Sequence, residues 1–123
     1  MLIADDVWVV IVETLKKYKG IELLQEHRKR IEALAEIRPF DGGVVVIRDN
    51  EFDIFVTPQR RGKWPIKKIV KETVENLISK YGKAVVSIHK ENKPSMRLAI
   101  GLGFVPVSES GCVVRLEKKL WTQ

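Results

Sequence analysis

A basic turn follows the apolar run that ends at residue 56, and a helical pattern begins directly after it. The turn consists of Gln59, Arg60, Arg61, Gly62 and Lys63. A glycine at a strand end lets the backbone approach a ligand closely, and the first amides of a helix point at an anion. The three cations add positive charge at the same place. These residues predict a phosphate-binding loop, and a basic turn without a ligand fits them equally well.

A second segment, residues 92–104, contains a helix that begins at Asn92 and leaves through Gly103 and Phe104 into another strand. Asparagine is a preferred N-cap residue, because its side-chain oxygen accepts a hydrogen bond from the first turn of the helix. The same side chain, placed at a strand exit, can also bond to a ligand. The two roles are compatible, and the sequence leaves both open.

Together the two segments resemble the GNAT family of N-acetyltransferases. Residues 56–63 are similar to its pyrophosphate loop, V-x-P-x-x-R-G-x-G, and residues 92–104 to its N-x-x-S/A-x-x-L…L-G-F segment. In that family the helix of the second segment lies beside the pantetheine arm of acetyl-coenzyme A. The resemblance therefore implies that the chain binds acetyl-CoA or another acyl-CoA. The cofactor contacts that it implies are backbone groups of Phe55 and Val56, and Gln59, Arg60, Arg61, Gly62, Lys63, Asn92 and Ser95.

The reaction implied by the resemblance is direct attack of an amine on the thioester within a ternary complex. Such a transfer needs a base for the attacking ammonium and an acid for the leaving thiolate. Glu51 is the nearest match to a glutamate that family members often carry on the strand before the loop, and Asp53 shares its strand face. His89 ends the next strand, and histidine exchanges protons near neutral pH. The simpler interpretations are surface carboxylates on a hairpin and an ordinary strand-end histidine.

Three residues depart from the family pattern. Trp64 stands where the loop has a small residue, and Pro65 follows it and lacks an amide hydrogen. Ala99 stands four residues after Ser95, where a tyrosine is common, and alanine cannot protonate a thiolate. An outward Trp64 indole would leave the loop amides available, whereas an inward one would exclude the cofactor. Two function classes stay open. An N-acyltransferase is favoured, and the alternative is a GNAT-shaped binding or structural protein, such as a component of a larger assembly or virion.

Composition indicates one globular domain over residues 1–123, with 45% hydrophobic and 31% charged residues. The net charge of +6 suggests an anionic partner. Nucleic acid is the least favoured such partner, because no recognised binding motif is present. The oligomeric state is open, with a homodimer as one alternative. The acceptor amine is also open, as either a small molecule or a protein.

No apolar run reaches the roughly 18 residues of a membrane span. The single cysteine, Cys112, excludes an internal disulfide framework and a cysteine-rich metal site, so we expect no metal and a cytoplasmic location.

Periodicity predicts a GNAT-like α/β fold with a mixed sheet, in the order α-α-β-β-α-β-α-β-β. The second helix is expected over residues 21–37, where Arg38 and Pro39 stop it, and the front of the sheet is expected to be truncated to a remnant strand at residues 1–3. The clearest helix is expected over residues 65–81. It should bridge a parallel pair formed by residues 54–56 and 85–88.

Overall fold

The computed structural model describes residues 3–61 and 64–120, with the backbone alone at positions 64 and 65. In this part of the chain six strands form one mixed sheet in the order β1-β2-β3-β4-β6-β5. The strands are β1 (Glu36–Phe40), β2 (Gly43–Arg48), β3 (Glu51–Val56), β4 (Lys83–His89), β5 (Val105–Ser110) and β6 (Val113–Lys119). The helices are α1 (Asp5–Lys19), α2 (Gln25–Leu34), the 3-10 turn η1 (Pro58–Arg60), α3 (Trp64–Tyr81) and α4 (Lys93–Gly101).

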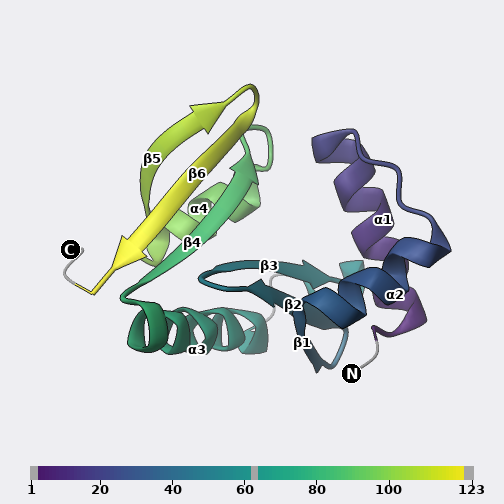
Figure 1. Cartoon of the computed structure of the whole chain (residues 1–123). Helices are drawn as coiled ribbons and strands as arrows, with labels where there is room; N and C mark the ends of the chain where they lie inside the picture. Colours follow the sequence, from purple (N-terminus) through teal and green to yellow (C-terminus); the bar gives the residue numbers. More distant parts are fainter. Residues whose placement is uncertain (1–2, 62–63, 121–123) are drawn as a thin grey trace.

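Side chains that alternate along the strands build two separate cores. Val44 and Phe55 pack with apolar residues of α1 and α2. Their strand neighbours Val45 and Phe52 point to the opposite face and pack with residues of α3 and α4. The sheet therefore lies between two helical layers (Figure 1).

The N-terminal half contains a strand that the predicted order lacks. The sequence predicts a helix as far as residue 37, but α2 ends at Leu34 and β1 pairs antiparallel with β2. The pairing sets Ile37 opposite Val46 and buries its side chain in the core beneath α1. Pro39 fits this strand because β1 lies at the edge of the sheet, where a missing amide donor is tolerated.

Three strands therefore precede the basic loop, one more than the sequence predicts, whereas no described residue before α1 forms a strand, in keeping with the predicted truncation at the front of the sheet. Of the expected remnant strand, Met1 and Leu2 lie outside the described residues. Ile3 precedes α1 and is buried against it.

The parallel crossover is confirmed, because α3 connects β3 to a parallel β4. The predicted pairing of residues 54–56 with 85–88 is wrong. The register instead sets Glu51 opposite Val85, and Val85 N donates to Asn50 O at 2.8 Å. Beyond that point β3 stays beside β2 and β4 stays beside β6, so that the two halves of the sheet diverge (Figure 1).

Candidate functional site

Two adjoining cavities lie where β3 and β4 diverge, one of about 110 Å³ and one of about 600 Å³. The smaller cavity takes Asp53 from one face of the sheet and Phe52 from the other, so that it passes between the strands. The residues that line both cavities are Thr14, Tyr18, Ile54, Phe55, Asn92, Ser95 and Leu98. They come from α1, β3 and the start of α4. The two cavities therefore form one passage through the split sheet.

The edge of β3 turns backbone groups toward this passage. Thr57 N donates to Gly42 O at 2.8 Å, in the same register as the β2–β3 pairs. Bonded residues alternate along an antiparallel pair, so Phe55 directs its backbone groups to β2. The amides and carbonyls of Ile54 and Val56 consequently face the other way, toward the passage. Of the two residues predicted to contact the cofactor through their backbone, Val56 thus faces the passage and Phe55 faces β2, while the Phe55 side chain lines both cavities.

The start of α4 forms the opposite wall. Asn92 is its N-cap, as the sequence predicts, and its Oδ1 accepts a hydrogen bond from Ser95 N at 3.4 Å. Both residues line both cavities. Because Oδ1 already serves the helix, Nδ2 is the atom of Asn92 that can donate to a ligand.

The basic loop divides its side chains between two neighbourhoods. Arg61 lines the larger cavity, where its Nε donates to Val56 O at 3.1 Å. Arg60 instead pairs with Asp41, its Nη2 lying 2.6 Å from Oδ2. Gln59 is exposed and lines neither cavity. Among the predicted loop contacts whose side chains the structure describes, Arg61 lines the passage, and Gln59 and Arg60 do not.

The remaining loop predictions fall where the structure gives no side chains. Gly62 and Lys63 lie outside the described residues, and so do the side chains of Trp64 and Pro65. The orientation of the Trp64 indole therefore stays a prediction.

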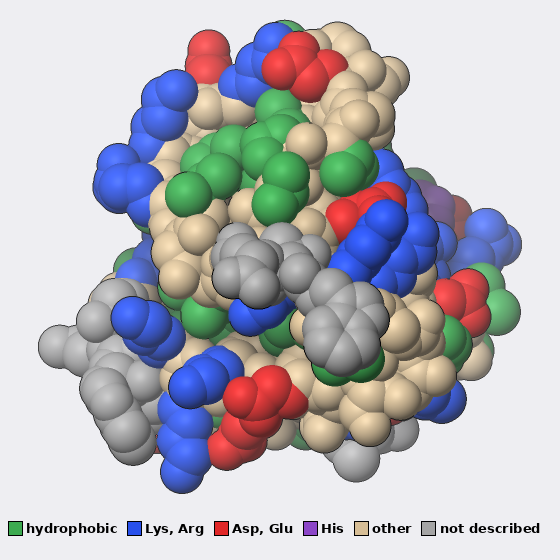
Figure 2. Space-filling model, turned by 90° about the vertical axis from the view of Figure 1, so that its left-hand side faces the viewer, with side chains coloured by type: hydrophobic (Ala, Val, Ile, Leu, Met, Phe, Trp, Pro, Cys, Tyr) green, Lys and Arg blue, Asp and Glu red, His purple; other side chains and the backbone are tan. Residues whose placement is uncertain are grey.

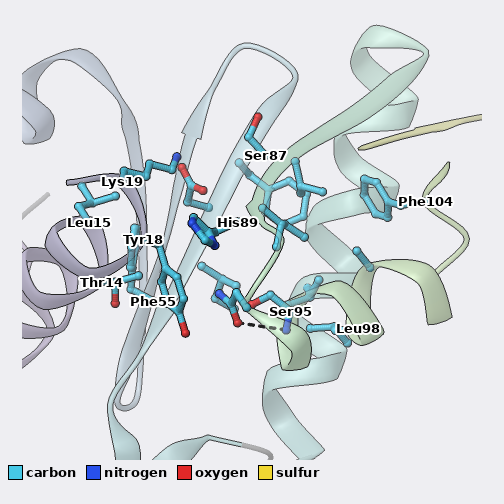
Figure 3. A pocket seen from close by; sticks show the side chains of 18 of the residues that line it. Thr14, Leu15, Tyr18, Lys19, Phe55, Ser87, His89, Ser95, Leu98 and Phe104 are labelled. Atoms are coloured by element: carbon cyan, nitrogen blue, oxygen red, sulfur yellow. Dashed lines mark hydrogen bonds between the residues drawn. The ribbon is translucent and has the colours of Figure 1, made fainter. Parts of the chain in front are cut away.

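Titratable side chains from three elements line the smaller cavity. Tyr18 and Lys19 come from α1 and His89 from β4, as Figure 3 shows, and Asp53 comes from β3. Burial raises the pKa of the Asp53 carboxyl above its ordinary value, and the charge of Lys19 opposes that rise. A carboxylate whose pKa moves toward neutrality is a better base for an amine.

His89 presents a donor to the cavity. Its Nδ1 accepts a hydrogen bond from Glu91 N at 3.1 Å, so the neutral ring carries its proton on Nε2. The ring centroids of His89 and Tyr18 lie 5.4 Å apart, which joins the end of β4 to α1 across the divergence. Asp53 and His89, two of the residues predicted to act as bases, therefore both line this cavity.

Glu51, the other predicted base, is not among the cavity-lining residues, although its negative charge adds to the rise in the pKa of Asp53. Glu51 belongs to the pair with Val85, where β3 and β4 still meet. Its Oε1 instead lies 3.5 Å from Arg115 Nη1. The structure thus brings Asp53 and His89 together and leaves Glu51 outside.

Sequence reasoning missed Tyr18 and Lys19. Tyr18 continues the apolar stripe of α1, and no local pattern distinguishes a packed tyrosine from one that reaches a cavity. Ala99 is buried and lines the smaller cavity, so the common acid position holds no proton donor.

The surface charges do not form one stripe on the face that Figure 2 shows, viewed from the side of β5. Lys and Arg side chains are spread over it with Asp and Glu among them, and hydrophobic side chains gather over its upper half. Val105 and Val107 of β5 are among the exposed apolar residues of the chain. A nucleic-acid-binding surface usually concentrates its basic residues on one face, and this face does not.

The described residues hold no group of three or more His, Cys, Asp or Glu side chains that could bind a metal ion. Among the described helices, none combines the length and the apolar content needed to cross a membrane.

No family model and no curated protein sequence matches the chain. Solved structures do. A spermidine N-acetyltransferase from Vibrio cholerae, in complex with CoA and spermine, aligns over 99% of this chain and 95% of its own, with a TM-score of 0.71 and 15% identity. A SpeG mutant from the same organism gives a TM-score of 0.55 and 19% identity over 63% of this chain. The dodecameric spermidine N-acetyltransferase from the same organism, in an intermediate state, gives a TM-score of 0.55 and 21% identity, again over 63% of this chain.

In these last two alignments the chain spans 56% of the length of the SpeG protein. The likenesses establish the fold. The chain has the GNAT fold that its two sequence segments predict, with the split between β3 and β4 at its centre.

Proposed function

We propose that the chain, as a single domain over residues 1–123, is an acyl-CoA-dependent N-acyltransferase that transfers an acetyl group to an amine. One observation carries this proposal. The sheet splits beyond the Glu51–Val85 pair, and the resulting passage connects the basic loop to a cavity with a carboxyl group of raised pKa. We also propose that the protein is located in the cytoplasm and forms a homodimer.

The larger cavity suits the acyl-CoA arm. Backbone groups of Ile54 and Val56 supply donors and acceptors on one wall, and Asn92 Nδ2 supplies a donor on the other. Arg61 and Lys67 line this cavity, and α3 begins at Trp64, so cations and helix amides meet at the same end. A diphosphate is the kind of group that this end would bind.

The smaller cavity suits the transfer itself. Asp53 takes a proton from the acceptor ammonium, and the resulting amine nitrogen forms a bond with the thioester carbonyl carbon. As the carbon–sulfur bond breaks, Tyr18 donates its phenolic proton to the sulfur, and the resulting phenolate takes the second proton from the nitrogen that becomes the amide. Tyr18 is suited to this step because, among the described residues, it is the titratable side chain that lines both cavities. The products are an amide and free CoA.

Calorimetric titration with acetyl-CoA, free CoA and ATP tests the proposal. We expect binding of both CoA compounds at micromolar to millimolar concentration, and weaker binding of ATP, which lacks the pantetheine arm. Arg61→Ala should weaken CoA binding about tenfold or more, since a hydrogen bond to a charged group contributes about 1.5–3 kcal/mol. Arg60→Ala is the matched control, because Arg60 pairs with Asp41 instead.

Failure of all CoA compounds to bind at millimolar concentration, in the native chain and in Trp64→Gly, contradicts the proposal. That result would favour the catalytically inactive binding or structural protein. Equal losses in Arg60→Ala and Arg61→Ala would contradict the placement of the phosphate end.

A further inference from the structure

The acceptor end of the passage carries a balanced pair of charges. Among the described residues that line the smaller cavity, Asp53 is the carboxylate and Lys19 is the ammonium. Lys19 is close enough for its charge to lower the pKa of Asp53, yet no direct ion pair joins the two in the described chain. Each group is therefore available to a ligand that carries the opposite charge.

The two groups lie at different depths. Asp53 is partly buried on β3, whereas Lys19 is exposed at the last position of α1. An acceptor with its ammonium at Asp53 would place its next substituent toward Lys19. That substituent meets a positive charge.

A polyamine does not match this arrangement. Each of its ammonium groups needs a carboxylate or an equivalent partner when it leaves water. Among the described residues that line the larger cavity, one is a carboxylate, Glu13, and three are cations, Lys17, Arg61 and Lys67. A second ammonium would therefore face lysine at either end of the passage.

We infer that the acceptor is a small amine that also carries a carboxylate, as an amino acid does, with its ammonium at Asp53 and its carboxylate at Lys19. This inference rests on the proposed function and names the substrate class of the same site. The rest of the smaller cavity is largely apolar, with Leu15, Leu102 and Phe104 in its wall, and its volume is about 110 Å³. A compact acceptor with an uncharged side chain fits that wall.

Matched acceptor pairs test the inference. Small apolar amino acids are compared with their carboxamides, and spermidine is included as the polyamine, with CoA release from acetyl-CoA as the measurement. We expect kcat/KM for the acid to exceed that for the amide and for spermidine by about tenfold or more, the range of a charged hydrogen bond. Lys19→Met keeps the length of the side chain and removes its charge, and it should bring the ratio of acid to amide close to one.

Lys16→Met is the control. Lys16 is also on α1 and lines neither cavity, and its Nζ lies 3.9 Å from Glu22 Oε1. This variant should keep the native ratio.

Three outcomes overturn the inference while leaving the acyltransferase in place. They are equal use of acid and amide, preference for spermidine, and an unchanged ratio in Lys19→Met. Absence of CoA release with every amine, although acetyl-CoA binds, overturns the proposed function and this inference together.

Discussion

The two ends of the passage are built in different ways. At the acyl-CoA end, the proposed contacts come from backbone groups of β3, the start of α3 and the cap of α4, each within a short stretch of sequence. At the acceptor end, they come from side chains on α1, β3 and β4, which are far apart in the chain. The first end is therefore specified by local conformation, and the second by how the helices dock on the sheet.

This difference predicts where substitutions have their largest effect. Backbone contacts survive a change of side chain, and each remaining polar contact contributes a modest part of the affinity. Loss of a proton-transfer group, in contrast, slows the chemical step itself. Substitutions at the acceptor end should therefore reduce turnover strongly, and those at the acyl-CoA end should reduce affinity modestly.

Asp53→Asn should have the largest effect. Loss of the base should lower kcat by a factor of about 10²–10⁴, the usual range for general acid–base catalysis, while CoA affinity stays unchanged. Glu51→Gln is the matched control on the same strand face, since Glu51 lies outside both cavities. Equal losses of turnover in the two variants would remove Asp53 from the role of base.

Asp53→Asn should also stabilise the fold at neutral pH. Burial raises the pKa of Asp53, so the folded state binds this proton more tightly than the unfolded state. The native chain should lose stability as the pH rises from about 3.9, the ordinary aspartate value, through the raised pKa of the folded state. The amide introduced by the substitution cannot ionise, so the variant would not show this loss. Urea unfolding of both proteins across this range measures the difference, and a less stable variant at pH 7 would contradict it.

Tyr18→Phe should have the next largest effect, a decrease in kcat of about a hundredfold through loss of the acid. The ring and its contact with His89 remain, so CoA affinity should be unchanged. Tyr81→Phe is a close control, because each tyrosine has a neighbouring lysine over its ring, at 5.1 Å for Tyr18 and 5.3 Å for Tyr81.

A thioester with a more acidic leaving thiol needs less help from an acid. With such a thioester, the kcat of Tyr18→Phe should therefore return much of the way to the native value. If the variant turns over the ordinary thioester at the native rate, Tyr18 is not the acid.

The sequence predicted the fold class and the elements that carry the proposed acyl-CoA end because both depend on local patterns. The Asn92 cap, the helix that became α3 and the parallel crossover follow from spacing and residue type. Strand β1 was missed because Ile37 continues the helical spacing of α2, and its burial beneath α1 is a tertiary effect.

The acceptor end could not be predicted in the same way. Glu51 and Asp53 are equivalent by strand alternation, and only the point of divergence separates them. Glu51 lies at the pair that still joins β3 and β4, and Asp53 lies beyond it, in the cavity. Tyr18 reaches that cavity because α1 docks across the split, a contact that no short segment encodes.

The smallest predicted effect is at Asn92, where the acyl-CoA end depends on one side chain with two roles. Asn92→Ala removes both the cap to Ser95 and the Nδ2 donor, so we expect losses of about 1 kcal/mol in stability and about 1 kcal/mol in CoA affinity. Asn92→Asp separates the roles, because aspartate caps a helix as well as asparagine does but offers no donor. Its unfolding free energy should match the native value while its CoA affinity falls, as calorimetry and urea unfolding can measure together. Native affinity in Asn92→Asp would show that Asn92 serves the helix alone, leaving the β3 backbone and Arg61 to hold the ligand.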